Sequence, residues 1–187
     1  MLVQYRDTAA VEPLRKLITD SKFPQGRLHA LWTLEALRGT NEATLLRTLN
    51  DDHHAVREHA VRIGERYINS MPRVAKKIAL LAGDEYPRVR FQVAFTLGDW
   101  TDRSAAIDSL AAIATGDAED EFIRTAVLSS VPYRATSLLD SLLKRDALRD
   151  TGSAQLLAEL VSLIAAGGKP SEIDRAMTLV TSEKVPP

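Results

Sequence analysis

The amino-acid sequence predicts an all-α protein in which helix pairs stack on one another as a solenoid. An aliphatic residue followed by arginine recurs after 33 and then 34 residues, and an acidic turn precedes each copy. The copies are Val56-Arg57, Val89-Arg90 and Ile123-Arg124, with a weaker one at Gly26-Arg27. Self-similarity at this period is typical of repeated helix pairs, because one pair buries its apolar face only by stacking on its neighbours.

Length and composition favour one continuous domain, residues 1–187, of about five helix pairs at roughly 35 to 40 residues per pair. The formal net charge is −1, so the chain lacks the basic excess that nucleic acid would attract. Its longest apolar run, residues 156–166, is too short to span a bilayer, and we expect no direct membrane insertion. The absence of cysteine excludes disulfides, thiolate metal sites and cysteine nucleophiles within these residues.

Apolar residues keep a helical period almost throughout, and no alternating run bounded by turn signals predicts a strand. The expected helices span, in order, about 8–18, 25–37, 41–49, 54–68, 71–81, 87–97, 103–114, 120–131, 134–143 and 153–166. Pro13 lies early enough in the first of them to be tolerated. Gly39 is the expected left-handed stop of the second, Asn41 caps the third, and Gly83 terminates the fifth.

The two ends of the chain depart from the regular repeat. Leu2 and Val3 resemble the tail of a missing helix, so we expect the chain to be a fragment of a larger protein. Residues 146–187 have a weaker period and are predicted to form a less regular C-terminal cap. This cap contains the stop Gly167-Gly168 and a last helix that Pro170 opens.

The repeated arginines have a structural explanation. An arginine at the start of a helix can reach the acidic turn of its own or the adjacent repeat, where its donors suit carboxylates and unpaired carbonyls. Contacts of this kind would form a ladder that sets the stacking register. Its members are Asp51 with Arg57, Asp84 with Arg90, and Arg124 as the next copy. The alternative is a row of arginines that binds an anionic ligand, and the acidic neighbours of each copy disfavour it.

The motif as a whole resembles the HEAT repeat. Each copy has an aspartate, a valine-arginine pair five to six residues later and a small residue three further on. The segments 27–35, 56–62, 87–92 and 124–130 are also similar to the HEAT segment of large exported proteins, the planctomycete-type membrane-bound dehydrogenases or haem-binding CxxCH proteins. That resemblance implies a periplasmic spacer between a sugar-dehydrogenase-like propeller and a c-type cytochrome domain. This chain has no Cys-x-x-Cys-His of its own.

A mixed aromatic and basic set is the candidate protein-contact surface. When the copies are aligned on their arginines, Trp32, Arg62 and Phe95 fall in the column five positions later, and Phe91 falls in the column one position later. In HEAT proteins the helix that carries the valine-arginine pair usually lines the concave side, and aromatic residues and arginine are enriched in interfaces. The alternative is that these bulky residues only widen the core.

Catalytic chemistry has little support. His53, His54, Glu58 and His59 crowd one helix start, but His59 is rotated about 100° from the face that His54 and Glu58 share. We therefore expect a solvated helix N-terminus there and no metal site. HEAT-fold iron hydroxylases use several His-Glu pairs, and HEAT-like DNA glycosylases use basic concave surfaces. Neither pattern occurs here, and nucleotide-binding loops are absent as well.

The sequence thus predicts a non-catalytic HEAT-repeat scaffold that needs no cofactor. Its partners would be other proteins or flanking domains of the same polypeptide, without nucleic acid. The alternative is the spacer of an exported redox protein that the family resemblance implies.

Overall fold

The computed structural model describes residues 8–145 and 151–181, and all regular structure within these ranges is helical. The α-helices are α1 (Val11–Asp20), α2 (Pro24–Ala36), α3 (Glu42–Thr48), α4 (His54–Gly64), α5 (Pro72–Leu80), α6 (Pro87–Gly98), α7 (Arg103–Gly116), α8 (Glu121–Ser129), α9 (Ala135–Lys144), α10 (Thr151–Ala166) and α11 (Pro170–Val180). Short 3-10 turns are η1 (Thr8–Ala10), η2 (Glu65–Tyr67) and η3 (Leu81–Gly83).

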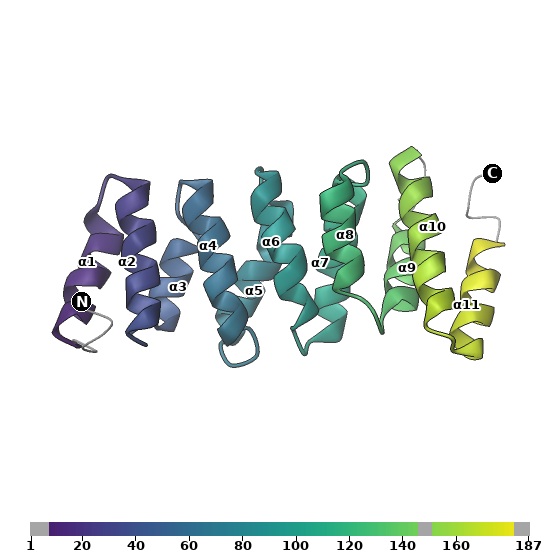
Figure 1. Ribbon diagram of the computed structural model, residues 1–187, viewed down its shortest axis with the longest axis horizontal. Coiled ribbons are helices and arrows are strands. Elements are labelled where there is room, and N and C mark those ends of the chain that lie inside the picture. The colour runs from purple at the N-terminus through teal and green to yellow at the C-terminus, as the bar shows by residue number, and fades with distance from the viewer. Residues whose placement is uncertain (1–7, 146–150, 182–187) are drawn as a thin grey trace.

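The helices stand side by side in two rows, with α1 and α11 at opposite ends (Figure 1). In one row α2, α4, α6, α8 and α10 each contact the next member. The odd-numbered helices from α1 to α11 do the same in the second row. Each helix therefore packs both on its sequence neighbour and on the helix two places along the chain, so that pair stacks on pair.

The apolar core lies between the two rows, and the recurrent aliphatic residues contribute to it. Val56, Val89 and Ile123, which precede the repeated arginines, are buried. Ala60, Val93 and Val127, which follow the same arginines, are buried as well. Burial of a valine or isoleucine side chain stabilises the fold by about 1.5 to 3 kcal/mol relative to exposure. The periodic motif thus marks the helix face that packs inward.

Local signals account for most helix starts. The Asn41 side chain accepts a hydrogen bond from the Thr44 amide at 2.9 Å, as a helix cap does. Proline occupies the first turn of α2, α5, α6 and α11, where its missing N–H leaves no bond unmade. The predicted helix 54–68 is divided in the structure, because α4 ends at Gly64 and η2 follows it.

The expected left-handed stop at Gly39 is wrong, because Arg38 has that conformation, with φ 58°. Gly39 has another role, since its amide donates to the Leu34 carbonyl at 2.9 Å and the chain passes close to α1 and α2. A Cβ atom on Gly39 would lie 2.7 Å from Cδ1 of Leu34 and 3.0 Å from Cγ2 of Val11. The glycine is required by close packing and not by its backbone angle.

Two expectations concern residues that the structure does not describe. The suggested helix tail at Leu2 and Val3 lies outside the described residues, and so does the beginning of the predicted cap at 146–150. Of the described part of the cap, α10 packs on α8 and α9, and α11 packs on α9 and α10. Gly168 has φ 65° at the end of α10, as the predicted stop requires.

Replacement of Gly39 by alanine is expected to lower the free energy of unfolding by about 1 to 3 kcal/mol, because the added methyl group overpacks the site. Gly83→Ala is the matched control, since nothing lies within 4 Å of a Cβ at that position. Its effect should stay within about 0.5 kcal/mol. Urea unfolding of both variants measures the difference, and equal stabilities would contradict the packing role of Gly39.

Candidate interaction surface

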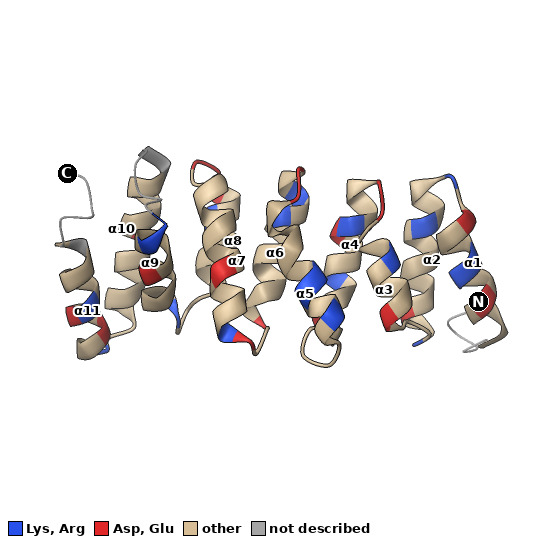
Figure 2. Cartoon of the chain, turned by 180° about the vertical axis from the view of Figure 1, so that it is seen from behind, with Lys and Arg blue, Asp and Glu red and all other residues tan. Residues whose placement is uncertain are grey.

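Four arginines at the starts of α2, α4, α6 and α8 make a repeated set of contacts, which we call the arginine ladder. Its members are Arg27, Arg57, Arg90 and Arg124 with the carboxylates that they bind: Asp51, Asp84, Asp117 and Glu159. Blue arginine bands and red acidic loops accordingly gather at the ends of these helices in Figure 2. The contacts join each repeat to the next one.

The first three arginines bind their aspartates through both Nε and Nη2. Arg27 is 2.6 Å from each carboxylate oxygen of Asp51, and Arg57 is 2.7 and 2.8 Å from those of Asp84. Arg90 binds Asp117 in the same two-point manner. Paired guanidinium–carboxylate bonds of this kind fix orientation as well as distance. Arg124 differs, because it donates one bond at 3.3 Å to Glu159 of α10.

The remaining Nη1 group of each arginine donates to a backbone carbonyl six residues earlier. The acceptors are the carbonyl oxygens of Ser21, Asp51, Asp84 and Ala118, at distances of 2.9, 2.9, 2.6 and 2.9 Å. The guanidinium groups of Arg27, Arg57 and Arg90 therefore each connect the turn before their own helix to the loop before the next helix of the same row, whereas Arg124 connects its turn to α10 itself.

The predicted pairs differ from this arrangement in their acceptor atoms. Arg57 contacts Asp51, and Arg90 contacts Asp84, but in both cases the acceptor is the backbone carbonyl of the aspartate. The carboxylates bind the arginine of the preceding repeat instead. Both the local loop and the adjacent loop are within reach of an arginine side chain, and sequence spacing alone does not distinguish them.

Two of the ladder carboxylates, those of Asp51 and Asp84, are ionised although they are buried. The side chains of Asp51 and Asp84 are 3% and 4% exposed. Burial acts to raise the pKa of each carboxyl, but hydrogen bonds from an arginine and from a backbone amide outweigh it. Together with nearby positive charges, these bonds hold the pKa of Asp51 and of Asp84 below the ordinary value. Removal of either partner would leave the other charge buried and unpaired, which would destabilise the fold.

Replacement of Arg57 by glutamine is expected to lower the free energy of unfolding by about 3 to 5 kcal/mol, because Asp84 is left buried without its cation. The matched control is Arg73→Gln, which removes the same charge from an exposed pair with Glu42. That change should cost less than about 1 kcal/mol. Urea unfolding at neutral pH compares the two, and similar losses would argue against a structural role for the ladder.

Acid is expected to weaken the same contacts. Because the pKa values of Asp51 and Asp84 are lowered on folding, the unfolded chain takes up protons at higher pH than the folded one. The contribution of the ladder is complete above the unfolded pKa of about 3.9 and is lost as pH falls through the lower folded values. Urea unfolding between pH 7 and pH 3 should therefore show the gap between the wild type and Arg57→Gln narrowing. A constant gap would contradict this account.

Two of the predicted contact residues, Trp32 of α2 and Arg62 of α4, lie together. The Arg62 guanidinium is 5.9 Å from the centroid of the Trp32 ring, and the indole Nε1 donates to Nδ1 of His59 at 3.1 Å. Burial lowers the pKa of His59, and the charges of Arg62 and Arg88 add to this effect against that of Glu58. A neutral imidazole can accept the indole hydrogen bond, so His59 holds Trp32 in place.

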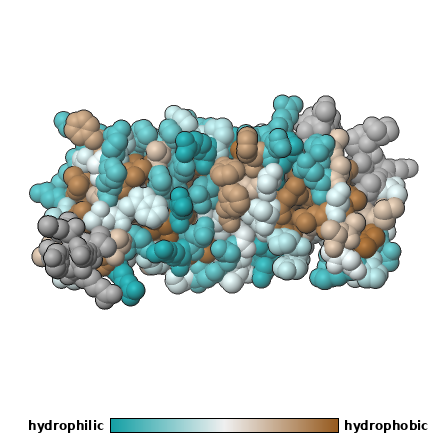
Figure 3. Space-filling view, viewed as in Figure 1, coloured by the Kyte–Doolittle hydropathy of each residue, from teal (hydrophilic) through white to brown (hydrophobic). Residues whose placement is uncertain are grey.

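The other two predicted residues, Phe91 and Phe95, form a second cluster on α6. Their rings meet edge to face with centroids 4.9 Å apart, and Phe95 is 40% exposed. A groove of about 310 Å³ runs from Phe91 to Phe122 of α8, which is 75% exposed. Figure 3 shows hydrophobic atoms gathered over α6 in the middle of this face.

The structure thus divides the predicted surface into two groups. Trp32 and Phe91 are partly buried and pack against the core. Part of each ring therefore widens the core, as the alternative interpretation expects. Arg62 and Phe95 are exposed. His59 and Phe122 belong to the same face but fall outside the two alignment columns, one and five positions after the arginine, from which the contact surface is predicted.

The histidines at the start of α4 are partly buried, and the expectation of a solvated helix N-terminus is wrong for them. Nδ1 of His53 accepts from the Ala55 amide at 3.2 Å and caps the helix. His54 stacks between His53 and Tyr86, with centroids 4.8 and 4.3 Å away. No group of three or more potential metal ligands occurs among the described residues. These histidines connect α4 to the turn before α6.

Comparison with known proteins adds no relative. No protein-family model matches the chain, and no curated protein matches it either. In the described ranges, no helix is long and apolar enough to cross a membrane. The HEAT resemblance therefore depends on the repeated motif alone.

Proposed function

We propose that this protein is a non-catalytic scaffold of the HEAT-repeat type, which holds another protein or a flanking domain on the face formed by α2, α4 and α6. The observation that carries the proposal is the exposed aromatic and cationic face centred on Arg62 and Phe95. Aromatic residues and arginine are the types that dominate binding energy in protein interfaces.

The arrangement of the helices supports a HEAT-type solenoid. Each helix contacts the helix two places along the chain, and the arginine ladder repeats the same contact at three successive junctions, from Arg27 to Asp51, from Arg57 to Asp84 and from Arg90 to Asp117. A stack in which each repeat contacts its neighbours forms an extended surface suited to binding partners. The repeated contact between successive helix pairs is therefore what supports a HEAT-type fold for the proposed scaffold.

The rigidity of the face supports a role in binding. Trp32 is fixed by His59 and covered by Arg62, and Phe91 supports Phe95 through an edge contact. Side chains that are already ordered lose less conformational entropy when a partner binds. A preorganised aromatic face is therefore a more effective contact surface than the same residues on loops.

Replacement of Phe95 by serine is expected to abolish partner binding and to lower the unfolding free energy by only about 0.5 to 1.5 kcal/mol, from the lost edge contact with Phe91. Trp32→Ser should be less stable, because its ring also fills space against the core. Phe23→Ser, at an exposed residue before α2, is the control that should retain both stability and binding. Loss of stability in Phe95→Ser equal to that in Trp32→Ser would mean that Phe95 belongs to the core.

Site-specific photo-cross-linking in source cells provides the partner for that assay. A photoreactive residue at position 95 should give one discrete cross-linked product, whereas the same residue at Leu80, exposed on α5 in the other row, should not. Identical products from both positions would contradict the proposed face.

A haem stain of the product and the parent band separates the two scaffold roles. A haem-positive parent band much larger than 20.6 kDa supports the redox spacer, and a haem-free band of this size supports an adaptor.

A further inference from the structure

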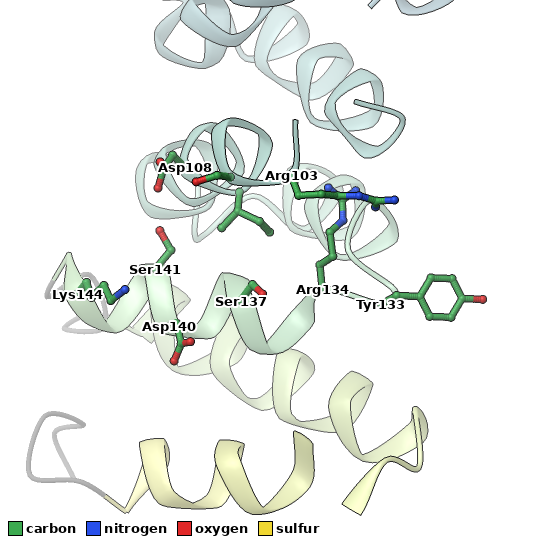
Figure 4. Close-up of a pocket in the computed structure, with 10 residues that line it drawn as sticks. Arg103, Asp108, Tyr133, Arg134, Ser137, Asp140, Ser141 and Lys144 are labelled. Atoms are coloured by element: carbon green, nitrogen blue, oxygen red, sulfur yellow. The ribbon is translucent and has the colours of Figure 1, made fainter. Parts of the chain in front are cut away.

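A second candidate site lies between α7 and α9, away from the arginine ladder. This hollow, which we call the α7–α9 pocket, has a volume of about 690 Å³. Arg103 and Arg134 lie together at one end, and Lys144 lies at the other (Figure 4). Ser104 and Ser137 line it near the arginines. Two guanidinium groups at one wall of a cavity repel each other, so their placement there is unfavourable unless an anion lies between them.

The arginines of the pocket differ from those of the ladder in having no carboxylate partner within residues 8–145 and 151–181. Nη2 of Arg134 donates to the carbonyl oxygens of Gly98 and Ser130, at 2.7 and 2.9 Å. Its Nη1 is buried without a hydrogen-bond partner. Among the described residues no ion pair joins Arg103 or Arg134 to an acidic side chain. The two cations are therefore close together and not neutralised by a direct contact.

The electrostatics of Arg134 reflect this crowding. Burial lowers the pKa of its guanidinium, the charge of Arg103 lowers it further, and the charge of Asp99 opposes them. In the ladder, by contrast, hydrogen bonds to aspartate raise the pKa of Arg27, Arg57 and Arg90. A negative ligand between Arg103 and Arg134 would remove the repulsion.

The start of α9 beside Arg134 adds to the positive potential, whereas the start of α7 is capped by the carboxylate of Asp102, which accepts from the Ala105 amide at 3.2 Å. Arg103 is the first residue of α7, and Arg134 immediately precedes α9. A helix N-terminus has a partial positive charge, so a cation placed there is disfavoured and an anion is favoured. No side chain caps the first amides of α9. The arginine pair and the helix start thus attract the same kind of ligand.

We propose that the α7–α9 pocket binds a phosphoryl group between Arg103 and Arg134, either as free phosphate or as the phosphomonoester of a small polar molecule. Two planar guanidinium groups match the charge and the oxygen geometry of a phosphate dianion. The hydroxyl groups of Ser104 and Ser137 can donate to further oxygens. The pocket is larger than a bare phosphate, and Asp108, Asp140 and Lys144 make the part away from the arginines polar, which suits a polar organic body.

The test is calorimetric titration of the whole chain at pH 7.5 with inorganic phosphate and, separately, with glycerol phosphate, against sodium chloride of equal ionic strength. Saturable one-to-one binding of either phosphate supports the proposal. Tighter binding of glycerol phosphate identifies a phosphomonoester as the preferred ligand, and equal binding identifies the free anion. Absence of saturable binding by both would overturn the proposal.

Arg103→Gln assigns the binding to the pocket. Arg103 is exposed and donates no side-chain hydrogen bond to any of the residues that the structure describes, and its removal relieves the repulsion on Arg134. The variant should therefore be at least as stable as the wild type in chloride. Its affinity for phosphate should fall about tenfold or more, as expected for one lost charge-assisted contact. Arg73→Gln removes the same charge on α5 and should leave the affinity unchanged. Equal losses in the two variants would mean that net charge alone attracts phosphate.

Discussion

The guanidinium groups of Arg27, Arg57 and Arg90 each contact two successive turns at once, and the position of the next helix pair depends on that junction. Apolar packing draws the rows together but is not directional, so small buried residues such as Ala60 and Val93 would permit neighbouring pairs to slide. A two-point bond between Arg57 and Asp84 has a fixed geometry. The ladder thus supplies the register that the core lacks, and its repetition gives the first three junctions the same geometry.

Burial makes this junction both specific and vulnerable. An aspartate removed from water is tolerated only with its arginine and amide donors in place. Asp84 illustrates the dependence, because its carboxylate accepts from Arg57 and from the Tyr86 amide, and its carbonyl accepts from Arg90. The loop at Asp84 therefore connects α4 with α6, the next helix of the same row. Damage at any junction should affect both neighbouring pairs.

The same residue type has different roles in this protein according to its surroundings. Arginines of the ladder are neutralised by carboxylates and belong to the framework. Arg62 lies over Trp32 at the surface and contributes to the proposed protein-binding face. Arg103 and Arg134 are placed together, and no carboxylate in the described part of the chain forms an ion pair with either of them, so their charges repel each other. Such local conflict within an otherwise consistent structure is a common property of binding sites.

The sequence by itself determined the helical class, most helix limits and the inward face of the repeat. These follow from local physics, because periodic apolar residues, the cap at Asn41 and proline in first turns act within a few positions along the chain. Only the tertiary structure decided which acidic loop each arginine binds, why Gly39 must be small and which rings meet at Trp32 and His59. Those outcomes depend on how loops and helices about 30 residues apart approach one another. The tertiary structure also decided that Arg103 lies beside Arg134, since no local pattern brings the starts of α7 and α9 together.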